Sequence, residues 1–94
     1  MEQPTSAGEL AELFKALSAD TRIRILRLLR DGPLCVNALA YRLGVTHSAV
    51  SQHLRVLRAA RLVLSDKQGY FVHYRLNDEA IGQLREALSH VLDE

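Results

Sequence analysis

The sequence predicts a mainly helical domain that carries one small β-hairpin. Its 94 residues are 48% hydrophobic but only 5% aromatic, a composition that is typical of a thin core built from packed helices. Apolar residues recur at helical spacing on both sides of residues 62–76, where β-branched and aromatic residues alternate instead. No internal repeat, linker or low-complexity segment interrupts the chain, so we expect residues 1–94 to form one domain.

The first helix is marked by its start signal. Ser6 and Glu9 have the spacing of a capping box, in which the serine accepts from a free backbone amide and the glutamate reaches back. Four apolar residues follow at helical spacing, and we expect the helix to run to about Ser18. They are Leu10, Leu13, Phe14 and Leu17.

A second helix is expected over residues 21–31, with Asp20 as its N-cap and Gly32-Pro33 ending it. Its apolar residues cover most of the helix surface, which predicts a place at the centre of the core; they are Ile23, Ile25, Leu26, Leu28 and Leu29. Its four arginines can extend to the surface. They also fit a helix that binds a membrane or a target protein, but the broad apolar coverage favours a core helix.

Two further helices form a helix-turn-helix candidate. We expect the third over residues 34–43, LCVNALAYRL, ending at Gly44. Thr46 can cap a fourth helix that runs to about Ala60. A connection this short that contains glycine is typical of the helix-turn-helix motif.

A hairpin and a last helix complete the chain. Residues 62–66 have strand character, DKQG (66–69) supplies a turn, and YFVHYRL (70–76) alternates as a second strand. Asn77 can cap a final helix, whose positive end suits Asp78 and Glu79. Four helices, a hairpin and a fifth helix make up a winged helix-turn-helix.

The fourth helix carries a polar face that folding does not require. Val50, Leu54 and Leu57 form its apolar stripe, and a second row at helical spacing is polar without any acid: Ser48, Ser51, Gln52 and Arg55. We call this row the polar face. Hydroxyl, amide and guanidinium groups donate to phosphates and base edges, whereas a carboxylate would repel the backbone of DNA. Residues beside this face and at the hairpin tip extend the predicted DNA-binding set; they are Thr46, His47, Lys67 and Gln68.

The charge distribution is uneven, although the net charge is only +1. No acidic residue lies between Asp31 and Asp66, a stretch that holds Arg42, Arg55, Arg58 and Arg61, whereas the chain after Asn77 is mainly acidic. We therefore expect one part of the molecule to be basic and another to be acidic. The alternative is that the charges cluster by chance on ordinary solvated surface.

Other features favour a cytoplasmic protein that does not enter membranes. No apolar run approaches the ~20 residues that a membrane-spanning helix needs. The N-terminal stretch MEQPTSAGEL is acidic and has no apolar core, so we do not expect a signal peptide. One cysteine, Cys35, cannot form a disulfide within the chain.

Residues 14–63 together with GYFVHYRL resemble the ArsR/SmtB family of winged-helix repressors. The combination of DTRIRIL with a following SAVSQHLRVLR is specific. The resemblance implies a homodimer joined through the first and last helices, which binds an inverted-repeat operator in double-stranded DNA and leaves it when an inducer binds. The apolar stripes of those two helices exceed what one small core buries, and they form the expected dimer interface: Leu10, Leu13, Phe14, Leu17, Ile81, Leu84, Leu88 and Val91.

The resemblance also suggests where an inducer binds. The family's thiolate sensors carry Cys-Val-Cys at the start of the third helix, where this chain has Cys35, Val36 and Asn37. One thiolate and an amide suit a thiophilic ion poorly. Cys35 is then either a small half-buried apolar residue or a redox-sensitive thiol.

The family's zinc, cobalt and nickel sensors bind metal on the last helix, with Asp-x-His early and His-x-x-His or His-x-x-Glu late. Here the first motif becomes Asp78-Glu79-Ala80 and the second becomes His90-Val91-Leu92-Asp93. Asp78 of one protomer with His90 and Asp93 of the other is therefore the expected site for Zn, Ni or Co. Three such ligands need water or another residue to complete a tetrahedral site. The alternatives are a redox signal at Cys35, a small organic ligand or no small inducer. Without the resemblance, His90 and Asp93 would be an ordinary exposed pair of residues three positions apart.

Two other classes of function are disfavoured. The sequence contains no Gly-rich phosphate loop, metalloprotease motif or nucleophile elbow, so we do not expect an enzyme. A winged helix that binds protein would show an apolar patch on the fourth helix instead of polar and basic groups. We expect His53 and His73 to be structural.

Overall fold

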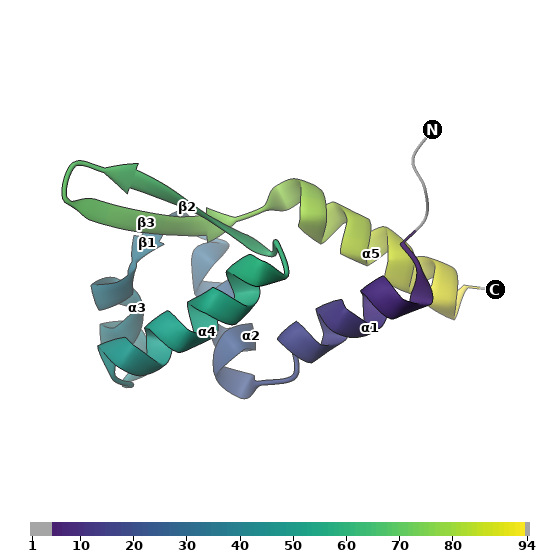
Figure 1. Ribbon diagram of the computed structural model, residues 1–94, viewed down its shortest axis with the longest axis horizontal. Helices are drawn as coiled ribbons and strands as arrows, with labels where there is room; N and C mark the ends of the chain where they lie inside the picture. Colours follow the sequence, from purple (N-terminus) through teal and green to yellow (C-terminus); the bar gives the residue numbers. More distant parts are fainter. Residues whose placement is uncertain (1–4, 94) are drawn as a thin grey trace.

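The computed structural model describes residues 5–93; residues 1–4 and 94, which include the start of the N-terminal stretch discussed above, lie outside it. The elements follow the predicted order with one additional strand, and their bounds are α1 Ala7–Ala16, α2 Asp20–Leu29, β1 Leu34–Cys35, α3 Val36–Leu43, α4 His47–Ala59, β2 Val63–Gln68, β3 Phe71–Leu76 and α5 Asp78–Leu92. The predicted winged helix-turn-helix is confirmed. Figure 1 shows α1 and α5 side by side at one end of the molecule and the tip of the β2–β3 hairpin at the other.

The additional strand turns the hairpin into a three-stranded antiparallel sheet with the order β1-β3-β2. Leu34 and Cys35 pair with Tyr74 and His73 on β3. The sequence-based start of the third helix at Leu34 was therefore wrong, and α3 begins at Val36. The reason is tertiary: β3 offers a free edge whose backbone groups these two residues satisfy.

The helix starts agree with the predicted caps in three of four cases. The Ser6 capping box is present, with the Glu9 amide donating to Ser6 Oγ at 3.1 Å. Thr46 caps α4 and Asn77 caps α5. The prediction for Asp20 was wrong, because Ala19 is the N-cap of α2 and makes no side-chain hydrogen bond. Asp20 is the first residue of the helix, where its charge lies near the positive end of the helix dipole.

The hairpin turn lies further along the chain than predicted. Gln68 pairs with Phe71, so the connection is only Gly69 and Tyr70. Lys67 and Gln68 are the last residues of β2, next to the turn. Gly69 has a φ of 65°, a left-handed conformation that glycine adopts without the clash of a Cβ atom.

The core lies between α2, α3, α4 and the start of the sheet. It contains ten buried apolar residues, namely Ala16, Ile25, Leu29, Leu39, Leu43, Val50, Leu54, Leu57, Leu62 and Val63. The central place of α2 is confirmed for Ile25 and Leu29, and Leu26 and Leu28 pack against the same core. Ile23 differs from the prediction, because 40% of its surface is exposed. The buried stripe of α4 fixes the direction of its opposite side, which reaches solvent.

Candidate nucleic-acid interface

Helix α4 is held rigidly at its start and along its apolar side. Thr46 Oγ1 accepts from the Ala49 amide at 3.0 Å, which satisfies one free donor of the first turn. Val50, Leu54 and Leu57 are all buried, as predicted. The orientation of the other side chains of α4 then follows from the helical repeat.

All four residues of the polar face are exposed, and so are Thr46 and His47; the polar face consists of Ser48, Ser51, Gln52 and Arg55. Within residues 5–93 the ion pairs are Lys15–Glu12 and Arg75–Asp66, and His90 lies 3.9 Å from Glu86; none of these contacts involves α4. The guanidinium of Arg55 is therefore not neutralised by a carboxylate of the described chain. Such a face can donate hydrogen bonds and offers no negative charge.

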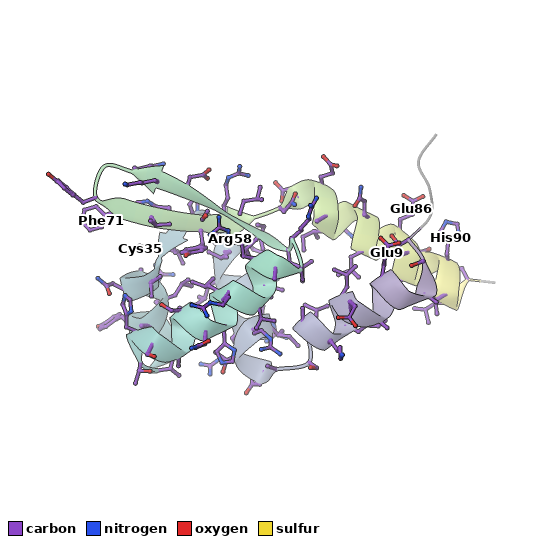
Figure 2. All side chains as sticks on the ribbon, viewed as in Figure 1. Glu9, Cys35, Arg58, Phe71, Glu86 and His90 are labelled. Atoms are coloured by element: carbon purple, nitrogen blue, oxygen red, sulfur yellow. The ribbon has the colours of Figure 1, made fainter. Side chains whose placement is uncertain are left out.

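A cleft of about 500 Å³ opens between α4 and β3. Its lining residues are Ser51, Leu54, Arg55, Arg58, Ala59 and Tyr74. Figure 2 shows Arg58 on α4 beside the strands. The cleft joins the C-terminal half of the polar face to the sheet. Along the chain Arg58 is only one member of a basic stretch, because its proximity to Tyr74 arises in the folded structure.

The tip of the hairpin carries polar and aromatic side chains together. Lys67 and Gln68 are exposed. Tyr70 is fully exposed at 100% and Phe71 at 60%, and Figure 2 shows Phe71 near the tip. In the sequence these two aromatic residues predicted only a strand. Because Tyr70 and Phe71 directly follow Gly69, their location at the tip could have been predicted from the sequence.

The eight apolar residues predicted at a dimer interface divide into two groups. Leu10 is buried, and Leu13, Leu17, Ile81 and Leu84 pack against the core of their own chain. Leu88 is half-buried, whereas Phe14 and Val91 are 41% and 57% exposed. The exposed members therefore represent the surface that one chain leaves uncovered.

Between α1 and α5 lies a hollow of about 770 Å³ that Phe14 and Val91 help to line. Glu9, Glu86 and His90 add polar groups to it, and Figure 2 shows these three side chains near the ends of α1 and α5. The hollow is continuous with the exposed apolar residues. Both belong to the surface where a second chain is expected.

The three predicted metal ligands do not meet within one chain. Asp78 begins α5 and His90 lies in its last turn, which separates them by about 18 Å at the helical rise. Residues 5–93 contain no group of three metal-ligating side chains placed to share an ion. His90 Nε2 lies 3.9 Å from Glu86 Oε1, a carboxylate that the sequence analysis did not include. Asp93 accepts a hydrogen bond from Ser89 Oγ at 2.8 Å.

Cys35 and His73 are directly opposite each other in the β1–β3 pairing. Side chains opposite each other in an antiparallel pair lie on the same side of the sheet. Both residues are half-buried, and His73 Nδ1 is buried without a hydrogen-bond partner among the described residues. The structure therefore places a thiol beside an imidazole from a different part of the chain. Periodicity alone did not predict this proximity.

Within the part of the chain that the structure describes, no helix has the length and apolar character that crossing a bilayer requires.

A rigid helix with a donor-rich face, beside a hairpin and a basic cleft, defines a winged helix-turn-helix regulator that binds DNA. The chain belongs to the arsR family of bacterial regulatory proteins, whose family model matches residues 19–65. It is a transcriptional regulator and not an enzyme.

Individual relatives support this membership. The chain is 43% identical to the HTH-type transcriptional regulator NmtR of Mycobacterium tuberculosis, over 90% of this chain and 72% of that protein. It is 41% identical to the transcriptional repressor SmtB homolog of Synechocystis sp., over 90% of this chain and 65% of that protein. Thus the chain spans about two thirds of the length of these relatives.

A solved structure shows the same architecture. The homodimeric winged helix-turn-helix DNA-binding domain Mb0332 of Mycobacterium bovis superimposes with a TM-score of 0.76 at 31% identity. The match covers 93% of this chain and 81% of that one.

Proposed function

We propose that this protein is a homodimeric transcriptional repressor that binds an inverted-repeat operator through α4 and the hairpin and leaves it when an inducer binds. The observation that carries the proposal is the exposed polar face of α4, free of acid and located beside a cleft lined by Arg55 and Arg58. A helix of this width fits the major groove, while Lys67 and Gln68 reach a neighbouring phosphate or the minor groove.

The dimer follows from the surface that α1 and α5 leave open. Phe14 and Val91 are exposed apolar residues next to the hollow between these helices. A second copy is the natural cover, because a self-complementary patch closes with two-fold symmetry. The Mycobacterium bovis domain is described as homodimeric. Two copies of α4 would then reach half-sites about one helical turn of DNA apart, ~34 Å.

The inducer of the proposed repressor is a divalent transition metal, Zn, Ni or Co. Asp78 of one protomer would lie beside His90 and Asp93 of the other protomer. Within a single chain Asp78 and His90 are too far apart along α5 to share an ion. Two carboxylates and an imidazole are a donor set that suits a borderline cation. Glu86 is close enough to His90 to complete the set, since 3.9 Å separates their side chains. Metal at this interface would change the spacing of the two α4 helices and so their fit to the operator.

A redox response is the second candidate for the inducing signal. The observation that favours it is that Cys35 lies opposite His73 in the β1–β3 pairing, and that His73 Nδ1 has no hydrogen-bond partner among residues 5–93. Cys35 is a free, half-buried thiol, and peroxide oxidises such a thiol through its thiolate form. Sulfenic acid at Cys35 would alter β1, which joins the sheet to α3.

One set of measurements tests the function. Duplexes selected from random sequence by the purified protein should contain an inverted repeat, and the affinity should fall steeply with salt. Zinc, nickel, cobalt and hydrogen peroxide are then added separately, with His90→Ala and Cys35→Ser as matched variants. If a metal releases wild type from DNA but does not release His90→Ala, the metal site is supported. If peroxide releases wild type but does not release Cys35→Ser, the redox site is supported. Failure to select any duplex would refute the proposed function.

Calorimetry separates metal binding from its effect on DNA. Wild type should bind one of the three metals, and His90→Ala should bind it more weakly, with proton release at the imidazole making the wild-type affinity pH-dependent. Glu86→Gln should weaken binding as well if this carboxylate is a ligand. Identical metal binding by wild type and His90→Ala would exclude the site on α5.

A further inference from the structure

The cleft between α4 and β3 has the chemistry of an anion site. Arg55 and Arg58 contribute guanidinium groups, Ser51 a hydroxyl and Tyr74 a phenol, while the apolar Leu54 and Ala59 complete the lining. Each of the four polar side chains can donate a hydrogen bond. Among the residues that the structure describes, no carboxylate lines the cleft. An occupant that accepts hydrogen bonds and carries negative charge therefore matches it.

The helical repeat gathers these donors on one side of α4. Ser51 and Arg55 are four residues apart and Arg55 and Arg58 are three apart, so the three side chains are neighbours on the helix surface. Leu54 is buried beneath them. Like charges at this spacing destabilise each other, so an anion bound to Arg58 would relieve the repulsion from Arg55.

The charges around the cleft are not neutralised within the described chain. Neither arginine takes part in any of the ion pairs found among residues 5–93. Asp66, the acidic residue of the hairpin, is already paired, since Arg75 Nε donates to its Oδ2 at 2.7 Å. Strand β3 therefore lines the cleft with Tyr74. The hairpin offers no unpaired carboxylate that would compete with an anion for the arginines.

We propose that this cleft seats one phosphate of the DNA backbone and that Arg58 is the residue that holds it. This inference rests on the proposed function and adds a separate role within the same surface. Arg58 lies in the last turn of α4, whereas helix-turn-helix proteins read bases with the N-terminal part of this helix. Its guanidinium therefore meets the backbone, where contacts set register without reading sequence.

The location of the cleft explains why the phosphate belongs to DNA. Ser51 and Arg55 belong both to the cleft and to the polar face, so the two surfaces are continuous. With α4 in the major groove, a phosphate next to the polar face would lie near this cleft. A phosphate held there would fix α4 relative to the wing, because its two walls come from α4 and β3.

The test compares Arg58→Ala with Arg58→Lys on a selected duplex and on a scrambled one over a range of salt concentrations. Loss of one phosphate contact should flatten the plot of log affinity against log salt by about 0.9 per protomer. The ratio of the wild-type affinity for DNA to that of Arg58→Ala should thus fall roughly 3.5-fold per protomer between 50 and 200 mM salt. Arg58→Lys should keep most of the slope, because it keeps the charge.

Arg24→Ala serves as the charge-matched control, since Arg24 is exposed on α2 and does not line the cleft. Its salt slope should equal that of wild type. The weakening in Arg58→Ala should be the same on both duplexes, and Tyr74→Phe should leave sequence preference unchanged. Circular dichroism checks that each variant remains folded.

Three results would overturn the proposal in distinguishable ways. An unchanged salt slope in Arg58→Ala, with wild type still bound to DNA, would remove the phosphate seat and leave the proposed function intact. Weakening confined to the selected duplex would make Arg58 a base-reading residue. Binding of inorganic phosphate by the free protein, seen as ³¹P line broadening that Arg58→Ala abolishes without changing the DNA slope, would identify a site for a free anion instead. Failure of wild type to bind any duplex would refute the proposed function itself.

Discussion

Arg22 on α2 and His53 on α4 are joined side chain to side chain, with Arg22 Nη1 3.4 Å from His53 Nδ1. The same guanidinium donates from Nε to the Ala16 carbonyl at 2.7 Å and from Nη2 to the Lys15 carbonyl at 3.4 Å. A guanidinium only donates, so Nδ1 of His53 is the acceptor in this contact. One side chain therefore ties the end of α1 to the helix that carries the polar face.

Replacing Arg22 with alanine should destabilise the fold. The change removes hydrogen bonds from a charged, half-buried group to two carbonyls and one imidazole, which should lower the free energy of unfolding by about 1–3 kcal/mol. Urea denaturation measures the change. Arg24→Ala, on the exposed side of the same helix, should stay within about 0.5 kcal/mol of wild type. Equal stability of both variants would show that the Arg22 contacts contribute nothing.

Gln52→Ala and Arg55→Ala should weaken binding to the selected duplex while the fold stays intact. Both side chains are exposed and point away from the buried stripe of α4. Loss of a base contact should cost about 1–3 kcal/mol and relax the preference at one base pair. Fluorescence anisotropy on single-substitution duplexes measures both effects. If neither variant loses affinity, α4 is not the helix that reads the operator.

Lys67→Ala should lower the affinity for all duplexes by a similar factor. Lys67 is exposed at the end of β2, and a lysine there meets phosphate as a point charge. Selected and scrambled duplexes should lose affinity alike, with the salt slope falling by about 1. A change in sequence preference would contradict a phosphate contact at this position.

Val91→Glu should dissociate the dimer without unfolding the chain. Val91 is 57% exposed on α5 beside the hollow between α1 and α5, so the charge harms the interface rather than the core. Leu13 and Leu84 are poorer targets because they pack against the core of their own chain. Sedimentation should show a monomer at micromolar concentration for Val91→Glu. Tyr41→Glu, at an apolar residue 90% exposed on α3, should remain dimeric. A monomeric wild type would refute the interface outright.

Arg61→Gly should stabilise the protein. Arg61 follows the C-cap of α4 with a φ of 63°, and its amide donates to the Arg58 carbonyl at 2.9 Å. The left-handed conformation strains any residue with a Cβ atom. Glycine at this position should therefore raise the free energy of unfolding by about 0.5–1 kcal/mol. Thermal unfolding measures the gain. Gly44, with a φ of 69° after α3, provides the reverse change, and Gly44→Ala should be destabilising. A loss of stability in Arg61→Gly would mean that the arginine side chain contributes more than the strain.

Local interactions are what the sequence by itself determined. The capping box of Ser6 and Glu9 and the cap of Thr46 involve residues three positions apart, so the pattern and the hydrogen bond coincide. The stripe of Val50, Leu54 and Leu57 likewise follows from one period of 3.6 residues. These signals were enough to predict the helices, the hairpin and the exposed polar face of α4.

Tertiary structure alone decided the contacts between distant segments. Leu34 and Cys35 became a strand because the edge of β3 accepts their backbone, and helix propensity at the third helix carried no sign of that partner. Tyr74 came to face Arg58 across a cleft, and Arg22 came to contact His53, which lies 31 positions away. Such pairs have no period in the chain, because they depend on how packed helices and a twisted sheet bring their surfaces together.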